Sequence, residues 1–255
     1  MVLPSQERQP GYPPHPDGTE LFTAKAYTVF TLAPSDYNAI LLSIKVAVTA
    51  TVLSLPFGFA VAWLITYGRF RGKLVLEVLT NLPLTLPPVV IGYLLLLLLG
   101  SNGLLGQLLD SIGIRLIFTW RAAVIATAVV GFPLMVRSIR LAMESIDPDL
   151  VHAARTLGAS RLNAILTVIL PLSLRGIIAG SSLMFARGLG EFGATIIVAG
   201  NIPGVTQTIP MAIFEYASSP SGDTMALMLC VVSIAISIVV LLLHEYLCKR
   251  TMRAD

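Results

Sequence analysis

Long apolar runs separated by short polar segments are the main pattern along the chain. A helix needs about 20 apolar residues to cross the hydrocarbon core of a bilayer. Runs of this length occur at residues 38–67, 78–99, 119–141, 175–198 and 224–246. The pattern predicts an all-α polytopic membrane protein with about five transmembrane helices.

The polar segments divide the chain further. Residues 1–37 form a proline-rich tail that lacks the basic start and short apolar core of a cleavable signal peptide. The longest connection between spans is 142–174, and 249–255 is a short basic tail. We therefore expect a polar tail at 1–37, a transmembrane domain at 38–248 and a second tail at 249–255.

The composition excludes an ordinary water-soluble enzyme. Of the 255 residues, 55% are hydrophobic and 12% are charged, and the mean hydropathy is +0.83, whereas ordinary globular chains carry about 25% charged residues. The net charge of +3 is spread over short loops, so we expect a lipid bilayer around the chain and no nucleic-acid partner. His15, His152 and His244 are too scattered to predict a metal site.

The distribution of Lys and Arg predicts the orientation, because cytoplasmic loops of membrane proteins are enriched in both. One side of the predicted topology holds Arg8, Lys25, Arg115 and Arg121. The other side holds Arg69, Arg71, Lys73, Arg137, Arg140, Arg155, Arg161, Arg175, Lys249, Arg250 and Arg253. The richer side is predicted to be cytoplasmic, which puts the N-terminus outside and the C-terminus inside.

Prolines interrupt the second predicted span at positions 83, 87 and 88. Proline removes a backbone donor and kinks a helix, and lipid tolerates this only where protein or a cavity satisfies the freed carbonyl groups. The bend is either a static packing kink or part of a gate that includes Thr85 and Pro87. Thr85 itself either offers its hydroxyl to the pathway or bonds back to its own helix.

Charged residues occur inside the fourth predicted span. Arg187 and Glu191 are four residues apart, so they share one face of a continuous helix, and charges at such depth usually face a bundle interior or a water-filled cavity. Two interpretations are open, a pathway-facing stripe and an internal salt bridge. The stripe would comprise Ser181, Met184, Arg187, Gly188, Glu191 and Thr195.

The connection at 142–174 contains a short predicted helix from Asp149 to Leu157. Asp147, Pro148 and Asp149 form an acidic helix start, since proline suits the first turn and carboxylates suit the positive end of the helix dipole. Ala153, Ala154 and Gly158 then leave a surface that another protein can approach closely. A loop helix packed on its own bundle is the alternative interpretation.

This segment resembles the EAA loop of the permease subunits of bacterial ABC importers. The resemblance is carried by the run from His152 to Gly158 and by Val168, Ile169, Leu170 and Pro171. The sequence has His152 where the family has a leading glutamate, and Val168 where it usually has isoleucine. The resemblance implies the ABC importer permease fold, with a coupling helix that docks on an ATP-binding cassette through His152, Ala153, Ala154, Arg155, Gly158 and Arg161.

Further motifs resemble the molybdate branch of the oxyanion permeases over roughly residues 38–250. They are Leu82 to Gly92, Phe185 to Thr195, Gly200 to Gly204 and Gln207 to Pro210. The resemblance implies import of molybdate or tungstate through a bacterial inner membrane, together with two cassettes and an extracytoplasmic molybdate-binding protein. A sulfate or thiosulfate permease is the related alternative.

The chain has no G-x-x-x-x-G-K-[ST] sequence: its one Gly-Lys pair, Gly72-Lys73, is followed by Leu74. We therefore expect no catalytic residue and no cofactor in this chain, with ATP-Mg used by the partner cassette. Five spans are few to enclose a path for a dianion, so we expect a homodimer with the path on its two-fold axis, working by alternating access. An ATP-independent anion carrier or channel is the alternative from a different class.

Overall fold

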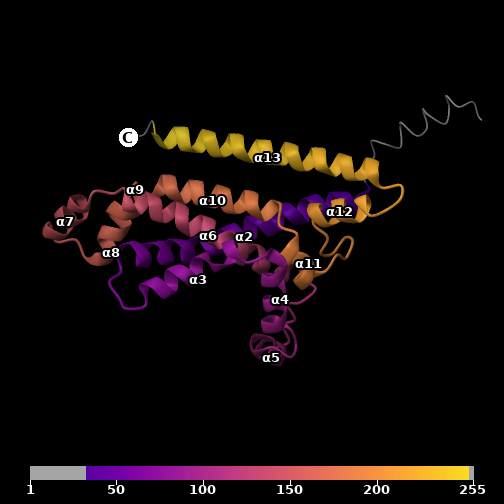
Figure 1. Ribbon diagram of the computed structural model, residues 1–255. Coiled ribbons are helices and arrows are strands. Elements are labelled where there is room, and N and C mark those ends of the chain that lie inside the picture. Colours follow the sequence, from indigo (N-terminus) through magenta and orange to yellow (C-terminus); the bar gives the residue numbers. More distant parts are fainter. Residues whose placement is uncertain (1–32, 253–255) are drawn as a thin grey trace, which may run out of the picture. The chain divides into compact units, whose positions relative to one another are not determined.

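The computed structural model describes residues 33–252, and within that range every regular element is helical (Figure 1). The predicted all-α class is confirmed. The predicted tail at 1–37 lies outside the described residues except for its last five positions. Of the predicted basic tail, 249–252 continue the last helix and 253–255 lie outside the described range.

Three helices are long and apolar enough to cross a membrane. They are α2 (Pro34–Tyr67), α6 (Trp120–Glu144) and α13 (Asp223–Met252, apolar as far as Tyr246). Two bent helix pairs also pass the length and composition test, which raises the number of possible spans to five. This agrees with the number expected from the apolar runs.

The second predicted span, at 78–99, is two helices. They are α3 (Lys73–Thr85) and α4 (Pro88–Leu99), whose axes differ by 116°. The break falls at Leu86 and Pro87, both with extended backbone, because the adjacent prolines at 87 and 88 offer no N–H to continue the α3 ladder. The chain therefore turns sharply between α3 and α4, where the sequence predicted a kink within one helix.

The fourth predicted span, at 175–198, is also not one helix. Here α10 (Leu174–Leu189) ends before Gly190, and α11 (Gly193–Ala199) begins after Phe192. Glycines at 188, 190 and 193 weaken helix continuation, and Glu191 accepts a hydrogen bond from the N–H of Ala194 at the start of α11. The apolar partner of α10 is instead Arg161–Leu172, bent from it by 66°.

The remaining helices are short. The connection at 142–174 holds α7 (Pro148–Thr156), α8 (Arg161–Ala164), a π-helix (Ile165–Ile169) and α9 (Leu170–Leu172). It is therefore mostly helical, and its second half is apolar enough to extend α10. Elsewhere lie α5 (Leu104–Ser111) and α12 (Ile209–Ala217).

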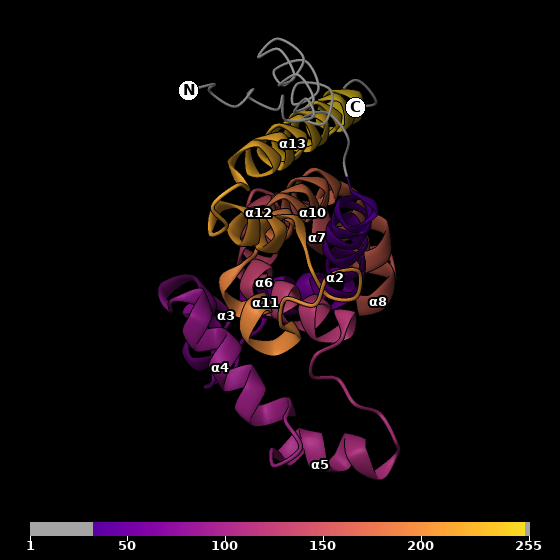
Figure 2. The same cartoon turned by 90° about the vertical axis from the view of Figure 1, so that its right-hand side faces the viewer.

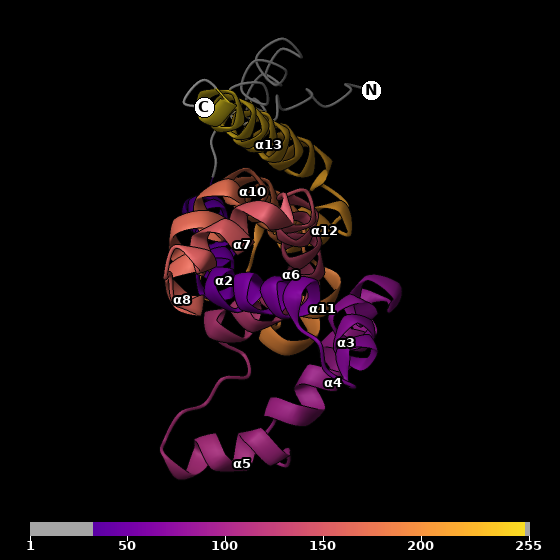
Figure 3. The same cartoon turned by 90° about the vertical axis from the view of Figure 1, so that its left-hand side faces the viewer.

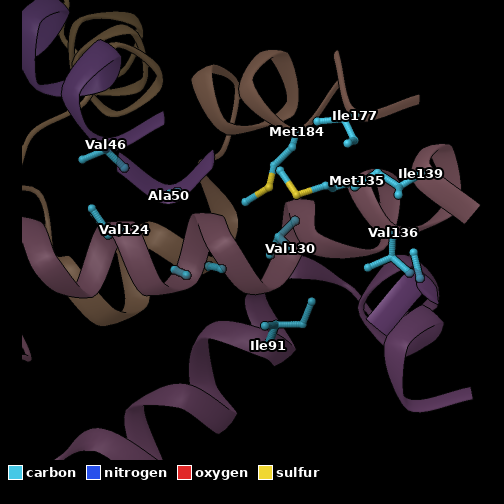
Figure 4. Packing of buried hydrophobic residues seen from close by; sticks show 14 of the residues in the cluster. Val46, Ala50, Ile91, Val124, Val130, Met135, Val136, Ile139, Ile177 and Met184 are labelled. Carbon is cyan, nitrogen blue, oxygen red and sulfur yellow. The ribbon is translucent and has the colours of Figure 1, made fainter. Parts of the chain in front are cut away.

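The core lies where α2, α6 and α10 pack against one another. Figures 2 and 3 show these helices between α13 on one side and α3 to α5 on the other. Small residues permit the close approach: a Cβ added at Gly176 would lie 2.8 Å from the carbonyl oxygen of Ser138, and one at Gly180 would lie 2.9 Å from that of Met135. Figure 4 shows Met135 of α6 beside Met184 of α10 in this core.

The loops separate to the two ends of the bundle. The α2–α3 loop, α7, α8 and the C-terminal end of α13 lie at one end, while α12 and the start of α2 lie at the other (Figure 1). The second end also holds the loop after α11, since the N–H of Phe118 donates to the carbonyl of Val198 and Gly204 lies beside Asn38. The arginines of the first loop and of the 142–174 connection therefore share one end.

Candidate coupling and translocation site

The helix expected in the 142–174 connection is present as α7, and both of its ends are capped. The Oδ1 atom of Asp147 accepts a hydrogen bond from the N–H of Asp149 at 3.0 Å, and Pro148 occupies the first turn. At the other end Ala159 donates to the carbonyl of Ala154, and Gly158 donates to that of Arg155. This pair of bonds is a Schellman cap, which places Gly158 at φ 93° and so favours glycine.

The two faces of α7 have different surroundings. Pro148, Val151, His152 and Arg155 recur every three or four residues and line a cavity of about 600 Å³ against the bundle. The opposite face carries Leu150, which is 49% exposed, and Leu157, the residue directly after α7, is 88% exposed. Ala153 is exposed between them. Apolar side chains turned away from their own bundle are typical of a surface that a partner covers.

The predicted docking residues therefore separate into two groups. Ala153 lies on the outward face and Ala154 is half-buried. His152, Arg155 and Arg161 line the cavity on the bundle side. The space around Gly158 is open. Sequence reasoning missed Leu150 and Leu157, although an exposed leucine at each end of a small-residue pattern in a polar loop was an available signal.

Arg187 and Glu191 form an ion pair across the end of α10. The Arg187 Nη2 atom lies 2.7 Å from the Glu191 Oε2 atom, and the Glu191 side chain is 1% exposed whereas that of Arg187 is 34% exposed. The other carboxylate oxygen, Oε1, accepts from the N–H of Ala194 at 2.8 Å. The carboxylate thus joins α10 to α11, and Glu191 lies beyond α10 instead of on one helix face with Arg187.

The other members of the predicted stripe lie mainly in helix packing. Met184 is fully buried against Gly131, and Gly188 is packed on Thr127 and Ala47. Thr195 is also buried, and its hydroxyl, like that of Ser181, has no hydrogen-bond partner within residues 33–252. In this subunit Arg187 is the member of the stripe with the most exposed charge.

A second polar region, between α3 and α6, was not predicted. Glu77, Asn81 and Thr85 recur every four residues on α3 and line a cavity of about 550 Å³ with Arg137 and Arg140 of α6. The Arg140 Nη1 atom pairs with Glu77, and its Nε atom lies 2.6 Å from Glu144.

The α3–α6 cavity is lined by charged side chains from two helices that belong to apolar segments, and such charges in membrane proteins usually indicate a functional surface. The predicted gate residues lie nearby. Pro87 is at the α3–α4 break, and the Thr85 hydroxyl bonds back to the carbonyl of Leu82 at 2.9 Å. Sequence reasoning used Arg137 and Arg140 only to orient the chain. The i,i+4 spacing of Arg140 and Glu144 was an available signal, whereas Glu77 is distant in sequence and belongs to another helix.

The loop between α11 and α12 is held by side chains at the opposite end of the bundle. Glu215 accepts hydrogen bonds from Asn201 at 2.8 Å and from Gln207 at 2.6 Å. Tyr216 donates to Asp36 at 2.9 Å, and its burial, together with this bond, raises the pKa of the Tyr216 hydroxyl. The Gly-Asn-Ile-Pro motif thus forms a braced loop at the end remote from α7.

These features define the class of protein: a helical membrane subunit with a capped, outward-facing loop helix at one end. The chain belongs to the family described as "Binding-protein-dependent transport system inner membrane component", whose model matches residues 54–253. It is therefore a multi-pass inner-membrane component of a binding-protein-dependent transporter and, as a permease subunit, is not an enzyme by itself.

Two relatives sharpen the comparison. The chain is 51% identical over 219 residues, 86% of this chain and 96% of the other, to the "Molybdenum transport system permease protein ModB" of Escherichia coli K12. It is 38% identical over 181 residues, 71% of this chain and 65% of the other, to the "Sulfate transport system permease protein CysT" of Salmonella typhimurium.

A solved structure shares the fold. It is a bacterial alginate ABC transporter in complex with a pentasaccharide-bound periplasmic protein, with a TM-score of 0.72 at 17% identity, covering 88% of this chain and 82% of that one. At this identity the likeness concerns the fold alone, and it confirms the predicted ABC importer permease fold.

Proposed function

We propose that this chain is the permease subunit of an ATP-driven importer of molybdate or tungstate. The observation that supports the substrate class is the 51% identity to a molybdenum permease across 96% of that protein's length. The sulfate permease is less similar and is matched over a shorter part of its length. Sulfate or thiosulfate is accordingly the second candidate.

The proposed assembly is a homodimer with two ATP-binding cassettes and an extracytoplasmic molybdate-binding protein. The cassettes supply the ATP-Mg site, and this chain holds no cofactor. The outward face of α7, with Leu150, Ala153 and Leu157, is the surface offered to the cassette, and Ala154 and Gly158 support its shape. Exposed apolar side chains in a loop outside the apolar spans favour this arrangement over a loop helix that merely packs on its own bundle.

The proposed orientation puts the α7 end in the cytoplasm, with the N-terminus outside and the C-terminus inside. The segments that carry Arg69, Arg71, Arg155 and Arg161 support it, because the α2–α3 loop, α7 and α8 lie at one end of the bundle (Figure 1). A cysteine at Ser160 should then be protected from an impermeant thiol reagent added outside. A cysteine at Gly204 would be strained at φ 74°, so Val205, which is 56% exposed, is the better external position.

The mechanism that follows is alternating access. Closure of the cassettes draws the two α7 helices together, and the bent pair ending in α10 transmits this movement to α6 and α2, on which α10 packs. The path then contains the α3–α6 cavity with Thr85 and Arg137 near the cytoplasmic end. Arg187 is a further candidate pathway residue, with Glu191 holding it in place.

The test is uptake by proteoliposomes that contain this chain, the cassette and the binding protein. We expect radiolabelled molybdate uptake that requires internal ATP and the binding protein and that excess tungstate, but not sulfate, suppresses. Uptake without ATP would support a carrier or channel instead. Suppression by sulfate at the same concentration as tungstate would favour a sulfate permease.

A further inference from the structure

The cavity of about 600 Å³ on the bundle side of α7 is lined by residues for which the proposed docking of the cassette gives no role. It is lined by parts of three segments: the end of α2 with the loop after it, the bundle-facing side of α7, and α8 with the π-helix. The outward face of α7 lies on the other side of this helix. A cassette bound to Leu150 and Leu157 therefore does not need the cavity.

The charge of the lining is of one sign. Arg69, Arg155 and Arg161 line the cavity with the imidazole of His152, and no Asp or Glu is among the lining residues. Within residues 33–252 none of these three arginines forms an ion pair with a carboxylate. Three unpaired guanidinium groups around one cavity favour an anion, and guanidinium suits the oxygens of a phosphate.

The remaining lining is apolar and aromatic. Trp63 and Tyr67 come from the last two turns of α2, where this apolar span ends, and Ile165 and Ile169 come from the apolar segment that leads into α10. Trp and Tyr are enriched where a span meets the membrane–water interface. The ligand should therefore be anionic at one end and apolar at the other.

We propose that this cavity binds the phosphate headgroup of an anionic phospholipid from the cytoplasmic leaflet. Basic pockets between helices on this side of a membrane are suited to such headgroups. Arg69, Arg155 and Arg161 hold the phosphate, while Trp63 and the isoleucines contact the start of the acyl chains. Because the headgroup bridges the first loop, α7 and α8, it holds α7 in a fixed position relative to α2.

The chain contains two tryptophans, Trp63 and Trp120, which allows a direct binding measurement. In the Trp120→Phe variant of the full chain, reconstituted in nanodiscs, Trp63 is the remaining reporter. We expect brominated phosphatidylglycerol to quench Trp63 more strongly than brominated phosphatidylcholine at equal bromine content. Equal quenching by the two lipids would overturn the proposal.

Arg69→Gln tests the headgroup contact, and Arg71→Gln is its matched control. Arg71 is two residues away in the same exposed loop, yet it does not line the cavity. We expect Arg69→Gln to weaken the phosphatidylglycerol dependence of quenching about fivefold, and Arg71→Gln to change it less than about twofold. Equal effects would show only a general attraction to the charged surface and would overturn the site.

Two further arms separate the possible occupants. Glycerol 3-phosphate added to the solution should not reduce the quenching, and if it did, the site would take a soluble phosphate instead of a lipid. Thermal stability in phosphatidylcholine checks that Arg69→Gln is folded. Should that variant be unfolded, Arg161→Gln on α8 provides the same test, because Arg161 contributes the same charge from a different segment.

The cassette is the remaining possible occupant. Loss of the quenching difference when the cassette is added would assign the cavity to cassette binding and overturn the lipid assignment.

Discussion

Two membrane-spanning helices of this protein, α6 and α13, have opposite relations between apolarity and burial. In the most apolar 18-residue window of α6, 61% of the residues are buried, whereas in that of α13 only 11% are buried. Yet α13 is the more apolar of the two. The more hydrophobic helix is therefore the one that faces outward, the reverse of the rule for water-soluble proteins.

The residues explain the difference. The buried side of α6 begins with small residues such as Ala122, Ala123 and Ala126 and continues with larger ones such as Met135 and Ile139. By contrast, α13 exposes large aliphatic side chains, among them Leu227, Val231 and Leu242. Lipid tails are as apolar as leucine, so leucine gains little by leaving them, and helices associate through close backbone packing instead. In this subunit small residues lie where two helices approach most closely, and large aliphatic residues cover the exposed side of α13.

The largest effect is expected from enlarging a small residue at the α6–α10 interface. In Gly176→Leu the first added atom already meets the Ser138 carbonyl and the side chain of Ala142, so we expect a loss of about 3 kcal/mol or more of stability. Ala235→Leu, on the exposed surface of α13, produces the same side chain at an open position and should be close to neutral. Thermal unfolding in detergent measures both. Similar melting temperatures for the two variants would contradict the packing comparison.

The next effect concerns the buried charge between α10 and α11. Glu191→Gln leaves Arg187 without its carboxylate, and because Arg187 is partly exposed we expect a cost of about 2–3 kcal/mol, below the range for a fully buried pair. The double replacement with Arg187→Gln should recover part of that stability. Uptake by the double variant then tests the pathway role: full uptake would leave the pair with a bracing role only.

A smaller effect is expected where an exposed leucine lies outside the apolar spans. Leu157→Glu should weaken cassette binding about tenfold or more without lowering the melting temperature of the permease, since it removes an apolar contact that only the partner covers. Leu104→Glu, equally prominent on α5, is the control. Pull-down of the cassette and the ATPase rate of the complex are the measurements. Unchanged binding by Leu157→Glu would remove the outward face of α7 from the docking surface.

Gly158 is a poorer probe of docking than its place in the EAA-like pattern indicates. Its φ of 93° makes any L side chain strained, so Gly158→Leu would disturb the cap of α7 as well as the surface. We expect Gly158→Ala, which adds almost no bulk, to cost about 1 kcal/mol of helix stability. An unchanged melting temperature for Gly158→Ala would show that the cap tolerates a side chain.

The smallest effect is expected on the outer face of α13. Leu241→Ala shortens a side chain that is exposed on α13 and that we expect to contact lipid in both the folded and the unfolded subunit. It should therefore change stability by less than about 1 kcal/mol. Met135→Ala, in the core beside Met184, should cost about 2–5 kcal/mol. Equal losses would show that a partner protein, instead of lipid, covers this part of α13.

Local sequence signals predicted local structure well. Asp147, Pro148 and Asp149 predicted the start of α7 to within one residue, because capping depends on neighbours in the chain. The adjacent prolines predicted a bend in the second span but not its 116° angle, which depends on how α4 packs against α11. The apparent continuity of 175–198 was misleading, since hydropathy does not register that the helix stops and that the Glu191 carboxylate accepts from the N–H of Ala194 at the start of α11.

By itself, the sequence determined the class of protein, the number of apolar segments, the position of helix α7 and the family, because each follows from composition, run length or a local motif. The tertiary structure alone decided which apolar helix is buried in the bundle and which has most of its side chains exposed. It also decided that His152 and Arg155 face the bundle while Leu150 and Leu157 face away, and that Arg140 meets Glu77. The physical reason is that hydropathy measures transfer out of water, whereas these outcomes depend on contacts between segments far apart in the chain, in surroundings where lipid and protein interior are nearly equally apolar.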